Sequence, residues 1–220
     1  MPESTQPVTY QLKIVLVGIS PMIWRRIKVS SDIAIADLHY IIQIVMGWKE
    51  EHLHKFLIHG VHYGINYPGT GGLMGNAHEI KLSKFGFRER ELFSCEYDFN
   101  CSWKHQHGDC TSCLRSSVPR HQIRVEAILP EESDLILPVC TAGKGNCPPE
   151  NCGGASEFIS LRQQHSRFKL SLEVWGVDFS YLTQYWPIII YGQVGKNATY
   201  CSSSQNSELR KTFSRASLSD

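Results

Sequence analysis

The stretch from residue 8 to residue 47 restricts the fold of this chain most, because it passes from a period of two residues to a helical period. Residues 8–17 and 22–29 alternate between apolar and polar side chains, which predicts two half-buried strands. The short link between them favours an antiparallel hairpin. Over 35–46 apolar residues recur at helical spacing and Gly47 follows as a stop signal, so an amphipathic helix is expected there.

Three further alternating or apolar segments, 54–60, 91–99 and 122–129, indicate more strands. Residues 60–80 are rich in glycine and are expected to form a loop. The order strand, strand, helix, strand and then further strands predicts an α+β fold, with a mostly antiparallel sheet and helices on one face. The first elements resemble the start of a β-grasp.

Composition sets limits on the function. With 220 residues, 42% of them hydrophobic and 20% charged, the chain can bury a core of ordinary domain size. The net charge of +1 gives no bulk attraction to nucleic acid or to an anionic membrane, so such binding needs a local patch. The N-terminus lacks the features of a targeting signal, and the apolar stretch 185–192 is too short to span a membrane. A cytoplasmic protein is expected, and its eight cysteines are then thiols or metal ligands rather than disulfides.

Several motifs in the chain are too specific to be generic patterns. They are Pro-x-Ile-Trp-Arg-Arg, Leu-His-x-Ile-Ile-Gln, Met-Gly-Trp, His-Leu-His-x-Phe and Cys-Pro-Pro-Glu-Asn-Cys-Gly-Gly. With these motifs the chain resembles the plasmid pRiA4b ORF-3-like family, whose members are also called insertion-element passenger proteins. The resemblance implies an α+β domain over residues 8–170, found on bacterial plasmids and mobile elements. No established biochemical activity comes with it.

Residues 107–120 depart from the family pattern. The dipeptide His-Gln occurs at 105–106 and again at 121–122, and removing sixteen residues, 105–120, would restore the expected run WKHQIRVEAILP. The segment is therefore interpreted as an insertion, and either His105 or His121 fills the family position. The insertion has little apolar area to bury and is expected to protrude.

Residues 171–220 form a second departure, because the resemblance fades there. The last part of the chain is rich in serine and poor in apolar side chains. We expect it to be disordered from about residue 200.

Three cysteines, Cys140, Cys147 and Cys152, lie in a stretch rich in glycine and proline. Closely spaced thiolates in such loops suit tetrahedral zinc, although this spacing is not that of a standard finger. Cys110 and Cys113 of the insertion, or a histidine, could complete a zinc site. The alternative is a set of semi-buried thiols in a loop at the rim of the sheet.

Histidines offer a second candidate chemistry. His52 and His54 are two residues apart, which on a strand puts both imidazoles on one face, where they could bind a metal or act as a general base. Asp98, Trp103 and His105 could form a carboxylate–imidazole arrangement beside an aromatic wall. In each case an ordinary hydrogen-bonded network is the alternative, and for the second set it is the preferred one.

Trp24, Arg26 and Lys28 combine an aromatic ring with cations at a spacing of two residues. On a strand Arg26 and Lys28 share the outer face, whereas the neighbouring Arg25 points the other way. Arginine beside tryptophan can stack on bases and hold phosphate. They are candidate binding residues for nucleic acid.

The sequence therefore favours an accessory passenger protein of a plasmid or insertion element. Such a protein would be a non-enzymatic binding module that contacts a protein or nucleic acid of the mobile element through one face of its sheet, with no role for a membrane. A small metal-dependent or hydrolytic enzyme using His52, His54 and the loop from Cys140 to Cys152 is the alternative. A degenerate copy without intact function is a third possibility, because of the insertion and the altered end.

Overall fold

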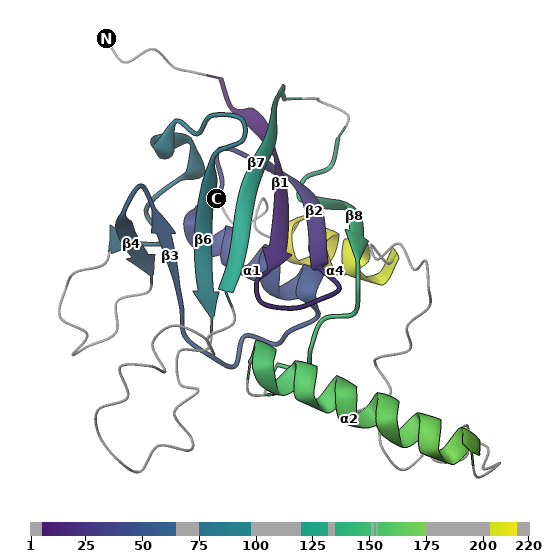
Figure 1. The fold of residues 1–220 in the computed structure, drawn as a ribbon. Helices are drawn as coiled ribbons and strands as arrows, with labels where there is room; N and C mark the ends of the chain where they lie inside the picture. The colour runs from purple at the N-terminus through teal and green to yellow at the C-terminus, as the bar shows by residue number, and fades with distance from the viewer. Residues whose placement is uncertain are drawn as a thin grey trace.

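A computed structural model describes residues 6–64, 75–97, 120–131, 135–150, 152, 154–174 and 203–214. The architecture is one eight-stranded sheet backed by helices (Figure 1). The strands are β1 Val8–Leu16, β2 Ile23–Ser30, β3 His54–Ile58, β4 Val61–Gly64, β5 Gly75–Asn76, β6 Leu92–Tyr97, β7 Arg120–Pro130 and β8 Val139–Lys144. The helices are α1 Ile35–Met46, α2 Ala155–Val174 and α4 Ser203–Ser214, with a short 3-10 helix, η1, over Leu82–Phe85.

Strand β1 lies inside the sheet, between β7 and β2. The strand order of the sheet is β5-β4-β3-β6-β7-β1-β2-β8, and every pair is antiparallel except β4 with β5. The predicted α+β class with a mostly antiparallel sheet is therefore confirmed. The opening order, a hairpin followed by a helix, is also as expected, and β1 has β7 as its second, antiparallel neighbour.

Helix α1 fills the inner face of the sheet. Ile35, Leu38, Ile42 and Val45 are fully buried, as the helical spacing predicts. The carboxylate of Asp37 accepts a hydrogen bond from the backbone N–H of Ala34, which satisfies a free donor at the helix start. Gly47 ends the helix in the left-handed region at φ 78°, a conformation that costs glycine little.

Among the described residues, helices cover one face of the sheet and leave the other open. Helices α1 and α4 lie behind β1, β2 and β8, whereas no helix of the described residues lies in front of β7, β1 and β2 (Figure 1). Helix α2 begins beside the β1–β2 turn, where the Arg162 guanidinium donates to the Ser20 carbonyl. The open face is called the outer face below.

Arg25 shows how the inner face is tied together. This side chain is 2% exposed, pointing from β2 into the core. Its guanidinium donates to the carbonyl of Val45 at 2.9 Å and to the sulfur of Cys147 at 3.2 Å. The buried cation thus joins β2, the last turn of α1 and the loop that follows β8.

The stretch 138–154 differs from the prediction of an irregular loop at the rim. Val139–Lys144 pairs with β2 as strand β8, and Cys140 is 2% exposed in the core. Edge pairing supplies hydrogen bonds that composition alone does not reveal. The interpretation as a loop at the rim is therefore wrong for Val139–Lys144, whereas Cys147 and Cys152 are half-buried thiols beyond the strand.

The predicted disorder from about residue 200 is wrong for residues 203–214, which form α4. Leu209 is fully buried and Phe213 packs against the core, so two apolar side chains one turn apart are enough to dock this polar helix. The side-chain amide of Asn206 also accepts from the N–H of Cys140 and donates to its carbonyl, which caps the free edge of β8.

Strand β7 departs from simple alternation at Glu126. The register against β1 shifts there, so that Leu12 faces Val125 whereas Gln11 faces Ala127. This β-bulge places Ala127 opposite Gln11 and not on the face of Ile123 and Val125, because an extra residue inverts the side-chain alternation.

Within the described residues, no helix combines the length and apolar character needed to cross a lipid bilayer.

Candidate functional site

The outer face carries a row of cations across three strands. Lys13 on β1 lies directly opposite Arg26 on β2 and also directly opposite Arg124 on β7. Directly opposed residues of antiparallel strands project to the same face with their Cβ atoms about 5 Å apart. Lys28 extends the row along β2 toward Gln11. The register therefore gathers cations that are far apart in the sequence.

Trp24 lies beside this row, on the same face of β2 and partly exposed. The Lys13 ammonium lies 4.9 Å from the ring centroid and the Arg26 guanidinium carbon lies 5.3 Å from it. Both distances are within the range of cation–π attraction. Lys13, Trp24, Arg26, Lys28 and Arg124 are together called the outer-face patch.

Glu126 is the carboxylate that accompanies the patch. It accepts two hydrogen bonds from Arg26, at 2.5 and 3.0 Å, and one from the Gln11 amide at 3.1 Å. The Arg26 hydrogen bond lowers the pKa of Glu126, and the same bond raises the pKa of Arg26. Both groups are charged at neutral pH, so Glu126 neutralises one cation of the patch.

A second unusual region is buried between α1 and the sheet. His39 of α1 and His54 of β3 stack with ring centroids 3.4 Å apart and planes 10° apart. His121 of β7 lies edge-on to Trp48, with centroids 5.2 Å apart. These three imidazoles, His39, His54 and His121, are called the histidine cluster.

The histidine cluster is electrically neutral. Burial lowers the pKa of His39 to about 2, with the neighbouring His54 and His121 adding to the effect. Burial also lowers the pKa of His54 and of His121 to about 4. Protonation would place a cation in a low-dielectric interior, which explains the direction of all three shifts.

Most of the unpaired polar atoms in the core belong to this region. Among the described residues, eight buried side-chain nitrogen or oxygen atoms lack a hydrogen-bond partner, and seven of them lie on the cluster histidines and Gln43. Gln43 follows His39 by one turn of α1. A buried polar atom without a partner costs about 1–3 kcal/mol. The cluster is thus a destabilising feature of an otherwise apolar core.

The loop after β8 closes the end of this region. The indole N–H of Trp48 donates to the Pro148 carbonyl at 2.8 Å. The Glu150 carboxylate accepts from the N–H groups of Lys49 and Glu51, at 2.7 and 2.9 Å, and from the Tyr97 hydroxyl. Burial alone would raise the pKa of Glu150, but these hydrogen bonds lower it. Glu150 therefore acts as a clamp between the loop and the segment after α1.

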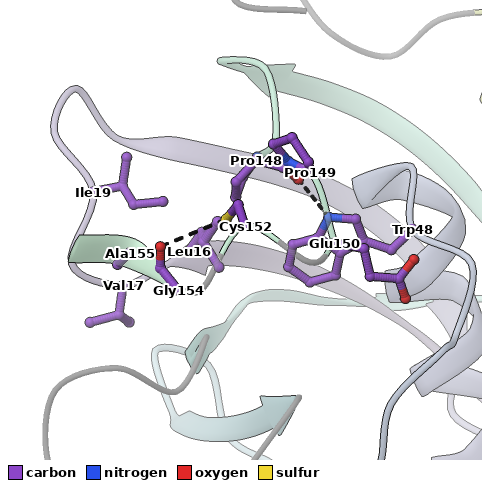
Figure 2. A pocket seen from close by; sticks show the side chains of 10 residues that line it. All are labelled: Leu16, Val17, Ile19, Trp48, Pro148, Pro149, Glu150, Cys152, Gly154 and Ala155. Atoms are coloured by element: carbon purple, nitrogen blue, oxygen red, sulfur yellow. Dashed lines mark hydrogen bonds between the residues drawn. The ribbon is translucent and has the colours of Figure 1, made fainter. Parts of the chain in front are cut away.

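A shallow depression lies beside this clamp, between the end of β1 and the loop (Figure 2). Its lining is largely apolar and includes Leu16, Ile19, Pro149 and Cys152, with Trp48 and Glu150 at one end. None of the cluster histidines lines it. The depression offers few polar groups for a ligand and is best explained as a packing feature of the loop.

The cysteines do not gather as a zinc site among the described residues. Cys140 is disulfide-bonded, so the expectation that the cysteines are thiols or metal ligands is wrong for this residue. Cys147 is a free thiol beside Arg25 and Met46, and burial raises its pKa to about 11. Cys152 is also free and donates to the Gly154 carbonyl.

The histidines do not form a metal centre in the described part of the chain either. No group of three or more His, Cys, Asp or Glu is placed there to hold a metal ion. The stacking of His39 on His54 gives a reason. A ligating nitrogen directs its lone pair within the ring plane, and one ion cannot lie in two parallel planes 3.4 Å apart.

The predicted pair His52 and His54 falls into different surroundings. His54 points into the core, 7% exposed, whereas His52 precedes β3 and lies edge-on to Tyr97 with centroids 5.6 Å apart. Both residues therefore lie beside Tyr97, but the two imidazoles are not placed to bind one metal ion together. Asp98, Trp103 and His105 lie outside the described residues.

The structure adds residues that sequence reasoning missed. Lys13, Arg124 and Glu126 join Trp24, Arg26 and Lys28 on the outer face, and all three sit in the alternating patterns of their strands. The missing information was the β1–β7 register. His39 lies in the Leu-His-x-Ile-Ile-Gln motif. The polar residues of this motif on the apolar face of the helix are a signal that the sequence analysis did not use.

Comparisons with known proteins connect the chain to relatives of similar fold. Residues 8–107 and 119–168 match the family described as plasmid pRiA4b ORF-3-like protein, and the match breaks where the sequence predicts an insertion. The uncharacterized protein y4hQ of Sinorhizobium fredii is 28% identical over 148 residues, a match that spans 66% of each chain. The crystal structure of MM3350 from Methanosarcina mazei, a protein of unknown function, aligns with a TM-score of 0.62 and 28% identity over 92% of this chain and 98% of that one.

Proposed function

The chain belongs to the family of plasmid pRiA4b ORF-3-like proteins, and we propose that it is a non-enzymatic accessory protein of a mobile element that binds nucleic acid through the outer face of its sheet. The observation that carries this proposal is the row Arg124–Lys13–Arg26. Like charges directly opposite each other destabilise a sheet. Three cations in adjacent register positions are expected where an anionic partner neutralises them.

A polyanion is favoured over a protein partner by the balance of charge on this face. On the described side chains of β1, β2 and β7, the cations Lys13, Arg26, Lys28 and Arg124 stand against the carboxylate of Glu126. The chain as a whole carries only +1, so the excess is local. Cations that bind phosphates release the counterions condensed on the nucleic acid, so such binding depends strongly on salt concentration.

The metal-dependent or hydrolytic alternative has less support. The histidine cluster is closed, since His39 and His121 are fully buried. The Glu50 carboxylate lies 3.9 Å from the His39 ring, which is beyond hydrogen-bond distance. Glu150 is already engaged by three donors. The groups that would be needed for acid–base chemistry therefore serve packing or the clamp.

The proposal is tested by fluorescence anisotropy with labelled oligonucleotides of mixed sequence, single-stranded and duplex, added to the purified full chain. The double variant Lys13→Gln with Lys28→Gln should weaken binding at least tenfold, because it removes two phosphate contacts. The matched control is Lys81→Gln with Lys84→Gln, which changes the net charge equally beside the start of α1. Equal effects of both variants, or no binding by the wild-type chain, would refute the proposal.

A further inference from the structure

Trp24 is positioned as an aromatic platform inside the cationic row. Lys13 of β1 and Arg26 of β2 are register partners, two positions along the sheet from Trp24, and both side chains reach its indole ring. Across the neighbouring strands, Trp24 lies opposite Val15 of β1 and Lys144 of β8. The ring therefore has two cations over it and remains partly exposed.

This arrangement distinguishes between forms of nucleic acid. In a duplex the bases are paired and stacked on one another, so a ring lying on a flat sheet meets only the sugar–phosphate edges of the grooves. In a single strand the bases are free, and an aromatic side chain with basic neighbours binds them by stacking. Without an unpaired base, the partly exposed Trp24 would contribute little to binding.

The spacing of the cations also suits a single strand. Arg124, Lys13 and Arg26 lie on adjacent strands, which are about 4.8 Å apart, so the row spans roughly 10 Å across the sheet. A flexible strand can bend successive phosphates onto such a row while one base reaches Trp24. A stiff duplex would have to present both features at fixed positions.

Resting on the proposed function, we propose that the ligand of the outer-face patch is a single-stranded nucleic acid, with one base stacked on Trp24 and its phosphates on Lys13, Arg26, Lys28 and Arg124. Base identity is read weakly at such a site, because every base has a π-face. The chain should therefore bind single strands of different sequence with similar affinity.

The test compares Trp24→Leu and Trp24→Phe with the wild-type chain in competition between a single-stranded oligonucleotide and its duplex. Trp24→Leu should weaken single-strand binding about tenfold, since it removes the stacked ring, and Trp24→Phe should weaken it less. The salt dependence should stay unchanged in both variants. The control is Leu57→Ala, which changes an exposed apolar side chain of β3 that lies on the outer face like Trp24.

A second readout covers the case in which a variant is poorly folded. Single-stranded oligonucleotide should quench the tryptophan emission of the wild-type chain, and Trp24→Phe should remove most of that quenching while keeping the salt-dependent binding. If Trp24→Leu and Trp24→Phe bind single strands as tightly as the wild-type chain, or if the duplex binds more tightly, this inference is refuted while the proposed function stands. If neither form of nucleic acid binds the wild-type chain, the proposed function itself fails.

Discussion

The outer-face patch and the histidine cluster contain the same types of side chain, basic groups beside aromatic rings, but the sheet places them in opposite surroundings. In the patch, Lys13 and Arg26 flank Trp24 in contact with solvent and keep their charge. In the cluster, His39 and His54 are buried, stacked and neutral. The comparison teaches that exposure, more than residue type, decides whether such a group can meet a partner.

The two regions should also differ in what they contribute to stability. Ion pairs at the surface, such as the half-buried pair of Arg26 with Glu126, contribute about 0–1 kcal/mol. Changes in the patch should therefore alter binding and leave the fold intact. Changes at the cluster or its clamp should alter the free energy of unfolding. The predictions below test this separation from the largest expected effect to the smallest.

Acid should produce the largest effect, and it should act through the cluster. The unfolded chain takes up protons on its histidines near pH 6.5, whereas His54 and His121 resist protonation down to about pH 4 in the folded chain. The free energy of unfolding is therefore independent of this titration above about pH 6.5 and falls as the pH drops toward 4. By linkage this loss is about 3 kcal/mol for each residue.

Urea unfolding at pH 7, 5.5 and 4 measures this loss. Replacing His121 by Gln should reduce the pH dependence, whereas replacing the exposed His62 by Gln should leave it unchanged. A free energy of unfolding that is constant between pH 7 and pH 4 would show that the cluster is not buried as described.

The clamp should give the next largest effect. In Glu150→Gln the amide nitrogen faces a donor, so at least one of the N–H groups of Lys49 and Glu51 loses its acceptor. The expected cost is about 1–3 kcal/mol in the free energy of unfolding. Thermal unfolding measures it, with the exposed Glu157→Gln as a control. Equal melting temperatures for the two variants would contradict the role of Glu150.

Replacing His39 by Leu should stabilise the protein. The substitution removes two unpaired ring nitrogens and keeps a side chain of similar size in the core. We expect a gain of about 1–2 kcal/mol, reduced by the lost stacking on His54. Denaturant unfolding at pH 7 measures it. A large loss of stability would indicate that His39 has a partner in the folded protein, and the contrast between the two regions would then be wrong.

Glu126→Gln should have the smallest effect and should act on binding. In the free protein this carboxylate occupies the Arg26 guanidinium, so phosphate has to displace it. Removing its charge should tighten oligonucleotide binding by about threefold to fivefold, in keeping with the energy of an exposed ion pair. Glu96→Gln, which releases Lys55 elsewhere on the sheet, is the control. Identical gains in oligonucleotide affinity for both variants would indicate that the net charge of the chain, and not the position of Glu126, controls binding.

Much of the fold could be predicted because periodicity is a local property. The spacing of apolar residues over 35–46 predicted the helix that packs on the sheet, and alternation over 22–29 placed Arg26 and Lys28 on one face. Strand β8 and helix α4 could not be predicted in this way. Their stability depends on pairing with β2 and on burial of Leu209, which are tertiary contacts.

The candidate site was only half visible in the sequence for the same reason. The opposition of Lys13 and Arg124 depends on the β1–β7 register, which joins segments more than a hundred residues apart. The inward direction of His54 follows from its pairing with Tyr97 at the start of β3. The β1–β7 register leaves no local pattern, whereas His54 shares the alternation of Phe56 and Ile58, which are buried on the same face of β3.

The salt dependence of oligonucleotide affinity tests the central claim most directly. If the four cations of the outer face neutralise phosphates of a single strand, the logarithm of the association constant should fall with the logarithm of salt concentration with a slope of about −3. The Lys13→Gln variant should reduce the magnitude of that slope by about 0.7. An affinity that does not change with salt, or a slope that is the same in wild type and variant, would contradict the account.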